Sequence, residues 1–374
     1  MLITMHDVNF GECILYEEND RKLLVDCGAK FGNKGKDAYN SIKTKIGSNI
    51  DLLITHFDED HYNGINEIPN GTLFDNIYLP FYLYKGKTIV PVFHYALKLW
   101  AYSVVIGRQK KISTLHKFFL KIPKILSNSG VIKCVKEGDT INLSRLKLNV
   151  LWPPIESPFE SEYRPNIDSV FEAHDEFNKW RDTADNYTDS VERFYRDICL
   201  DDINDLEGTI NELNQSYETM IGSAPTIELS EDELNNYNAI NSSMIRNMNE
   251  CSVVFDCNDT LVAFGDVSAR IISWLRSDDT VKASYEVVKV QHHGTKSYWC
   301  DDIPSASYYL ISNSGIKRQD WKIDERYGKK ASKTCTILCT NDTVARCEYH
   351  NSKKKPCTKK CNLIKYNNEI KLKT

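Results

Sequence analysis

Residues Asp51–Gly64 read DLLITHFDEDHYNG, an apolar run followed at once by a dense group of histidines and aspartates. The apolar part, Leu52–Ile54, is typical of the end of a buried strand. Alternate residues of a strand share a face, so a tight loop leaving the strand can fold four polar side chains toward one point. These four are His56, Asp58, Asp60 and His61.

Imidazoles and carboxylates this close together are costly to bury, because the charges repel and each loses its hydration. A divalent cation removes that cost, since both groups are common ligands of zinc, manganese and iron. The sequence around His56 therefore predicts a metal loop, and a solvated polar loop is the alternative.

THFDEDH (residues 55–61) resembles the HxHxDH signature of the metallo-β-lactamase superfamily, with Asp58 in the position of the middle histidine. The aspartate form is similar to that of the metallo-hydrolase domain of the DNA-uptake protein ComEC. DVNFGECILY (7–16) also resembles the DVGQGDxxLI opening of those hydrolases, with Asn9 and Glu12 as departures, and residues 138–154 resemble a later strand segment. The resemblance implies an α/β fold, the metallo-β-lactamase αββα sandwich, with an inserted helical lobe.

Two motifs in the second half of the chain extend the resemblance. LVAFGD (261–266) is similar to the FTGD segment whose aspartate bridges both metals, which here is Asp266; Gly265 is expected to let the backbone turn sharply before it. QHHGTKS (291–297) resembles HHGSKTS. One histidine of the pair is expected to complete the second metal's ligands, with His293 favoured, and His292 is then expected to hydrogen-bond the substrate or donate a proton.

The resemblance implies two divalent metal ions, zinc or manganese. His56 and Asp58 are expected on one ion, Asp60 and His61 on the other, and Asp266 on both. Asp60 is also expected to accept the proton of the attacking water. Three further site residues are expected. Asp26 supports the metal loop from behind or caps a turn, and Lys296 binds a phosphate or is a surface lysine. Asn249 or a water fills a gap in the first ion's ligands, or that site is weak.

The pattern along the chain predicts four regions. Residues 1–155 form the first part of the metallo-hydrolase domain, with a helical insertion at about 90–128, and residues 249–345 form the second part. Residues 156–248 are acidic and mainly helical, which favours an inserted lobe that caps the site, docks a protein partner or only stabilises the fold. Residues 346–374 are a lysine- and cysteine-rich extension.

Composition narrows the class of protein. The formal net charge of −5 implies no general attraction to nucleic acid or an anionic membrane. No apolar run reaches the roughly 18 residues of a membrane helix, and no signal peptide is evident. Twelve cysteines without a secretion signal predict reduced thiols and a cytoplasmic location.

A small structural zinc site is a second metal hypothesis, and free cysteines are the alternative. Its four residues are Cys347, His350, Cys357 and Cys361, whose spacing fits no common zinc finger.

The sequence therefore predicts a metal-dependent hydrolase that acts with a metal-activated water. A phosphodiesterase or nuclease is favoured, with nucleic acid or a small nucleotide as substrate. A lactone, amide or thioester hydrolase is the alternative within the fold, and a degenerate metal-fold module that binds a protein is the alternative outside enzymes.

Overall fold

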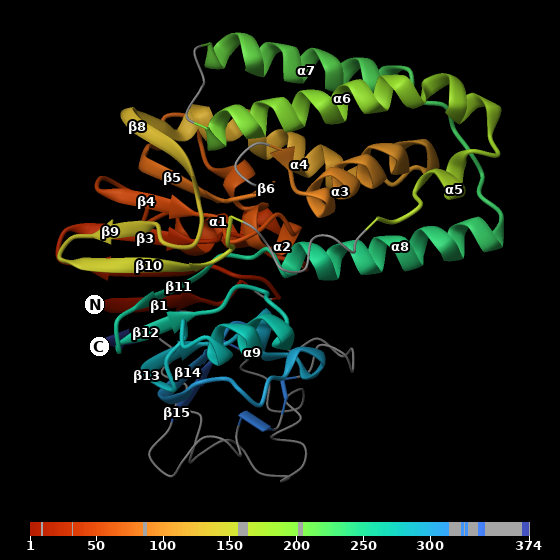
Figure 1. The fold of residues 1–374 in the computed structure, drawn as a ribbon. Helices are drawn as coiled ribbons and strands as arrows, with labels where there is room; N and C mark the ends of the chain where they lie inside the picture. Colours follow the sequence, from red (N-terminus) through yellow and green to blue (C-terminus); the bar gives the residue numbers. More distant parts are fainter. Residues whose placement is uncertain are drawn as a thin grey trace. The chain divides into compact units, whose positions relative to one another are not determined.

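The structure is a computed structural model that describes residues 1–8, 10–31, 33–84, 88–155, 164–200, 205–313, 323–324, 326–327, 336–340 and 369–373. The chain divides into two compact units. The first, here called the sandwich unit, comprises Met1–Pro80, Lys124–Pro154 and Asn249–Thr374. The second, the helical unit, comprises Phe81–Pro123 and Ile155–Met248. Figure 1 labels the elements of both.

One sheet of the sandwich unit has seven strands in the order β16-β1-β2-β3-β4-β5-β8. The strands from β16 to β3 pair antiparallel, and those from β3 to β8 pair parallel. The bounds are β1 Leu2–His6, β2 Ile14–Glu18, β3 Arg21–Val25, β4 Ile50–Leu53, β5 Phe74–Pro80, β8 Leu126–Val135 and β16 Glu369–Lys373.

The other sheet repeats this plan, with seven strands in the order β15-β14-β13-β12-β11-β10-β9. The strands from β9 to β12 pair antiparallel, and those from β12 to β15 pair parallel. The bounds are β9 Thr140–Leu143, β10 Leu146–Trp152, β11 Val254–Cys257, β12 Leu261–Ala263, β13 Ser284–Lys289, β14 Ser305–Ile311 and β15 Thr336–Cys339.

The two sheets pack face to face, because one buried apolar cluster draws on both. It joins Tyr16 and Leu23 of the first sheet to Leu148 and Phe255 of the second, and the Tyr16 and Phe255 rings meet edge to face at 5.8 Å. Outer helices are α1 (Gly35–Ile42), which contacts β1, and α9 (Ala269–Ser277), whose Trp274 lies against Trp152 of β10. The sandwich of two mixed sheets confirms the predicted fold class (Figure 1).

The start of one helix and one strand pairing were not predicted from the sequence. Helix α2 (Glu59–Tyr62) begins inside the metal loop, and a 3₁₀ turn, Ile65–Glu67, follows it. Asp58 explains this start, because its side chain accepts from the Glu59 N–H as an N-cap and acidic residues follow in the first turn. Strand β16 lies within the extension 346–374 and pairs along all of β1, from Leu2↔Lys373 to His6↔Glu369.

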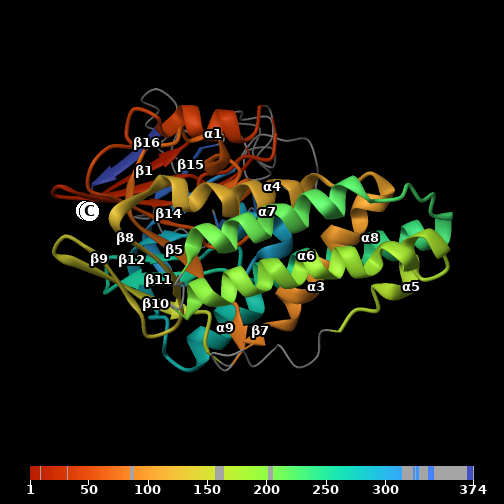
Figure 2. The same ribbon diagram turned by 90° about the horizontal axis from the view of Figure 1, so that it is seen from above.

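The helical unit contains both helical stretches read from the sequence. Figure 2 views its helices from above, with α6 and α7 side by side. Their buried faces are aromatic: Phe177, Tyr187 and Phe194 of α6 are fully buried. The bounds are β6 Leu83–Tyr84, β7 Thr88–Ile89, α3 Pro91–Tyr102, α4 Lys110–Lys121, α5 Asp168–Phe171, α6 Asp175–Cys199, α7 Leu206–Gly222 and α8 Glu231–Asn249.

Two histidines outside the sequence motifs have contact partners within this unit. His94 lies 2.6 Å from a carboxylate oxygen of Glu192, and His116 stacks on Tyr217 with ring centroids 3.8 Å apart. Both therefore have local structural partners.

The cysteines give a mixed result. Among the cysteines that the structure describes, six are buried free thiols, as predicted, whereas Cys134 and Cys199 are disulfide-bonded, so the expectation of reduced thiols does not hold for these two. None of the described helices is long and apolar enough to cross a membrane.

Candidate metal centre

The candidate site lies in the sandwich unit, where both sheets end their parallel strands. β3 leads into Asp26, β4 into His56, β12 into Asp266, and β13 into the pair His292–His293. Carboxyl ends of parallel strands meet at one edge of a sheet, and loops leaving that edge are where α/β proteins bind ligands. Because each of these polar residues follows a strand that ends at this edge, the fold brings residues from distant parts of the sequence together.

Backbone contacts hold the metal loop against the loop after β3. The Cys27 N–H donates to the His61 carbonyl at 2.7 Å, and the Gly64 N–H donates to the Cys27 carbonyl at 2.8 Å. Gly28 must be glycine for a steric reason, because a Cβ there would lie 2.3 Å from the backbone carbon of Asp60. These contacts fix the helical turn that carries Asp60 and His61.

Asp266 lies at the centre of the cluster. Its Oδ2 is 3.3 Å from Nε2 of His61, 3.6 Å from Nε2 of His293, 3.7 Å from Nε2 of His292 and 4.0 Å from Nε2 of His56. The glycine before it, Gly265, has no left-handed backbone; a Cβ there would lie 2.7 Å from the Cβ of Ser252. Close packing, and not the expected sharp turn, is therefore the reason for that glycine.

Among the described residues, two overlapping groups of side chains have the geometry to hold a metal ion. Each member of a group offers one ligand atom, and the ligand atoms of a group lie within 4.8 Å of one another. The first is His56, His61 and Asp266, and the second is Asp60, His61 and His293. His61 belongs to both. The predicted pairing, with His56 and Asp58 on one ion and Asp60 and His61 on the other, stays a prediction; these groups join His56 with His61 and Asp60 with His293.

The donor atoms of this cluster fit a cation. Nε2 of His56, His61 and His293, and Oδ1 of Asp266, are buried and make no hydrogen bond within the described chain. Such atoms cost free energy when they are buried without a partner. Four of them aimed at one region are the donor set of a divalent metal ion.

In each of the three histidines, Nδ1 lies within hydrogen-bonding distance of another group of the protein. His61 Nδ1 lies 2.7 Å from Asp26 Oδ2, and His293 Nδ1 donates to the Ser312 carbonyl at 2.9 Å. His56 Nδ1 lies 3.2 Å from the hydroxyl of Thr55, which itself donates to Asp26 at 2.7 Å. A proton held on Nδ1 leaves the Nε2 lone pair for a ligand, so these contacts select the tautomer that metal binding needs.

The charges of the cluster act strongly on one another. Burial opposes the protonated form of His61, but Asp266 and Asp26 outweigh it and raise the pKa of His61 well above its usual range. Burial lowers the pKa of His56 to about 4 and that of His293 to about 3. For Asp266, burial is outweighed by His61, His292 and His293, and its pKa falls well below the usual range. The site therefore holds one positive charge at His61 against its carboxylates, in the place where a cation would bind.

The adjacent histidines 292 and 293 have different surroundings. His293 is fully buried, and its Nε2 lies 3.7 Å from Asp60 Oδ2 as well as near Asp266. His292 is partly exposed, stacks on Tyr298 with centroids 3.6 Å apart, and has Nδ1 2.9 Å from the Thr295 hydroxyl. Both have left-handed backbone, with φ of 43° and 57°, a conformation that costs non-glycine residues free energy. Of the two, His293 belongs to a candidate metal group and His292 does not.

A buried ion pair behind His293 was not predicted from the sequence. Lys289 Nζ lies 2.8 Å from Glu12 Oε1, and Glu12 Oε2 lies 3.7 Å from His293 Nδ1. Burial raises the pKa of Glu12 to about 7, against the opposing effect of Lys289. A signal was present: Lys289 interrupts the apolar strand VVKV, and a lysine inside a buried strand needs a partner.

Five predicted site residues belong to neither metal group: Asp26 and His292, described above, and Asp58, Asn249 and Lys296. Asp58 is partly exposed and caps α2. Asn249 is buried, with Nδ2 3.4 Å from the Tyr298 hydroxyl and Oδ1 without a hydrogen-bond partner. Lys296 is exposed at the surface. The residues of the structural zinc hypothesis, Cys347, His350, Cys357 and Cys361, lie outside the described residues.

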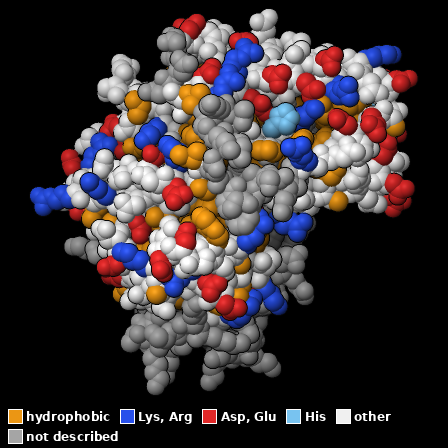
Figure 3. All heavy atoms as spheres, in the orientation of Figure 1, with side chains coloured by type: hydrophobic (Ala, Val, Ile, Leu, Met, Phe, Trp, Pro, Cys, Tyr) orange, Lys and Arg blue, Asp and Glu red, His pale blue; other side chains and the backbone are white. Residues whose placement is uncertain are grey.

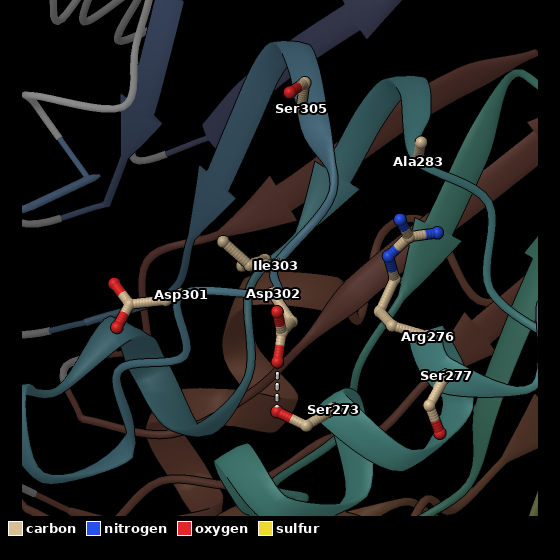
Figure 4. A pocket seen from close by; sticks show the side chains of 8 residues that line it. All are labelled: Ser273, Arg276, Ser277, Ala283, Asp301, Asp302, Ile303 and Ser305. Atoms are coloured by element: carbon tan, nitrogen blue, oxygen red, sulfur yellow. Dashed lines mark hydrogen bonds between the residues drawn. The ribbon is translucent and has the colours of Figure 1, made fainter.

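A cavity of about 410 Å³ lies elsewhere in the sandwich unit and contains none of the candidate ligands. Figure 4 shows its polar lining, including Arg276 and the Ser273 hydroxyl donating to Asp302 at 2.5 Å. The remaining lining residues are Ser277, Ala283, Asp301, Ile303 and Ser305. This cavity is therefore not the candidate metal centre.

No family model matches the chain, and no curated protein matches it. Among solved structures, it is similar to the metallo-β-lactamase fold protein YhfI from Bacillus subtilis, with 12% identity and a TM-score of 0.23 over 40% of this chain and 52% of YhfI. The match thus spans about half of YhfI. A flavodiiron protein from Giardia intestinalis has 7% identity and a TM-score of 0.23, over 91% of this chain and 79% of that protein. The fold assignment depends on the strand order and the ligand geometry, which agree with the predicted αββα sandwich.

Proposed function

We propose that this chain is a metal-dependent hydrolase, with a phosphodiester of nucleic acid or of a small nucleotide as its substrate. One observation carries the proposal: histidines that follow two other strands, β4 and β13, converge on Asp266. Nε2 of His56, His61 and His293 is buried there without a hydrogen-bond partner. The likeness of residues 55–61 and 291–297 to ComEC-type hydrolases supports the phosphodiester as substrate.

The residues take distinct roles in this proposal. His56, His61, Asp60, Asp266 and His293 would hold two divalent ions, zinc or manganese. Such ions, when bound, lower the pKa of a coordinated water, polarise the bond under attack and stabilise the leaving oxygen. The chain's part is to position these ligands through Asp26, Thr55 and Ser312, which fix the ring orientations.

Proton transfer falls to two residues at the edge of the cluster. Asp60 would accept the proton of the attacking water. His292 is more exposed than His293, is held by Tyr298 and Thr295, and would donate a proton to the leaving group. Burial lowers the pKa of His292, so its imidazole is mainly neutral at neutral pH and must take up a proton before it can donate one.

The test combines metal analysis with assays of defined phosphodiesters. We expect about two ions per chain, and hydrolysis of bis-p-nitrophenyl phosphate, cyclic nucleotides, RNA or DNA with manganese or zinc. Asp60→Asn should lose metal and lower kcat by about a hundredfold or more, because it removes a ligand and a proton acceptor. Glu59→Gln, the neighbouring residue, is the matched control and should retain both. Full activity and metal content in Asp60→Asn would contradict the proposal.

A further inference from the structure

Lys30 lies at the outer edge of the metal centre, on the loop after β3. Its ammonium Nζ is 3.6 Å from Oδ2 of Asp60. The Lys30 side chain is 38% exposed, whereas that of Asp60 is 4% exposed. The lysine therefore stands between solvent and the buried ligand cluster, with its charge directed at one of the candidate ligands.

Neighbouring residues hold the lysine in this place. Its backbone N–H donates to the Phe10 carbonyl at 2.6 Å, and its ammonium lies 5.7 Å from the centre of the Phe10 ring. The same ring packs against His293, with centroids 4.4 Å apart. A further backbone bond, from the Glu12 N–H to the Asp60 carbonyl at 3.0 Å, ties the Phe10 loop to the metal loop.

The ammonium is charged at neutral pH. A lysine side chain ordinarily carries its charge well above pH 7, and this one faces the carboxylate of Asp60. In the protein without metal, this charge offsets part of the carboxylate charge of the cluster. Once divalent cations share the charge of Asp60, the attraction between Asp60 and Lys30 weakens, and an anion arriving from solvent becomes the stronger partner.

We propose that Lys30 binds a phosphoryl oxygen of the substrate at the entrance of the metal centre. This rests on the proposed function and names the residue that selects an anionic substrate. A lysine ammonium is a compact point charge that suits phosphate. Lys296, the lysine predicted from the sequence for this role, is exposed at the surface, and its role stays a prediction that the test below compares with that of Lys30.

The test measures binding of AMP, a phosphomonoester product, to the manganese-loaded protein by titration calorimetry. Lys30→Met should weaken AMP binding about tenfold or more, because it removes a charge-assisted hydrogen bond. Lys30→Arg should retain most of the affinity. Lys36→Met, which removes an exposed lysine of α1, is the matched control and should bind AMP as the unaltered protein does. Equal melting temperatures would show that the variants fold alike.

Three outcomes would overturn the proposal. The first is an unchanged AMP affinity in Lys30→Met. If that variant changed only its manganese affinity, Lys30 would serve to balance the charge of Asp60. An equal loss in Lys36→Met would show a nonspecific effect of charge. A loss in Lys296→Met with none in Lys30→Met would return the role to Lys296.

Failure of the proposed function looks different from failure of this inference. A protein that binds AMP through Lys30 but hydrolyses no phosphodiester would refute the hydrolase and keep the anion site. A protein that hydrolyses phosphodiesters with the same KM before and after Lys30→Met would keep the hydrolase and refute the anion site at Lys30.

Discussion

At the scale of single residues, the centre depends on hydrogen bonds behind the ligands. Asp26 accepts from the backbone N–H and the hydroxyl of Thr55, and its Oδ2 faces Nδ1 of His61. It is fully buried and has left-handed backbone, with φ of 55°. One carboxylate thus orients His61 directly and His56 through Thr55, which makes Asp26 a positioning residue for two candidate ligands.

Asp26→Asn tests this role. The amide keeps the size of the side chain but loses the charge that holds the His61 proton on Nδ1, so we expect the affinity for zinc or manganese to fall 10- to 100-fold. Metal titration with a competing chelator measures it.

The matched control is Asp256→Asn. Asp256 is also a buried aspartate, on β11, but it bonds to Asn149 and Tyr285. Its replacement should leave metal affinity unchanged. Equal affinities in both variants would mean that Asp26 only caps its turn.

At the scale of elements, helix α4 shows how burial sets the charge state of a side chain. His116 is 3% exposed, stacks on Tyr217 and lies 3.3 Å from Asn214 Oδ1 through Nε2. Burial lowers its pKa to about 4, Asn214 opposes this, and Lys117 adds to the decrease. The folded helical unit therefore keeps this imidazole neutral at pH values where an unfolded chain would protonate it.

This predicts a loss of stability in acid. Below about pH 6.5 the unfolded chain binds a proton at His116 and the folded chain does not, until the pH reaches about 4. The free energy of unfolding should fall by roughly 3 kcal/mol across that range from this group alone, at about 1.4 kcal/mol per pKa unit. His116→Phe keeps an aromatic ring and should flatten this dependence in urea unfolding between pH 4 and 7.

His94→Gln is the control for that series. The hydrogen bond to Glu192 raises the pKa of His94, so its contribution has the opposite sign and is lost as pH rises. The acid loss should persist in this variant. An unchanged slope in His116→Phe would refute the assignment.

At the scale of the whole molecule, all residues of the candidate centre belong to the sandwich unit, although the helical unit interrupts that unit twice in sequence. The two halves of the sandwich supply matching sheet edges, and both must be in place for Asp266 to meet His61. On the face seen in Figure 3, acidic and basic side chains are interspersed over the described surface.

Metal should stabilise the folded chain because the ligand set exists only after both halves meet. Binding to the folded state alone adds about 2.7 kcal/mol when the free ion is at 100 times its dissociation constant. We expect manganese or zinc to raise the melting temperature by several degrees and a chelator to reverse it. Asp266→Asn should abolish the increase and Glu59→Gln should keep it. The same increase in Asp266→Asn would place the ion elsewhere.

The sequence alone determined the parts of this protein that depend on neighbours in the chain. Apolar runs ending in polar loops predicted β4, β12 and β13, and the motifs they carry predicted His56, His61, Asp266 and His293 as ligands. These signals are local, since strand periodicity and a dense polar loop are visible within about ten residues.

Only the tertiary structure decided the features that depend on pairing between distant segments. It joined β16 to β1, grouped His61 with both sets of ligands, paired Lys289 with Glu12 and placed Lys30 beside Asp60. Side-chain partners across two sheets follow from which strand ends meet at one edge, and a linear pattern does not record that register. The ligand types were therefore readable from the chain, whereas their partners required the fold.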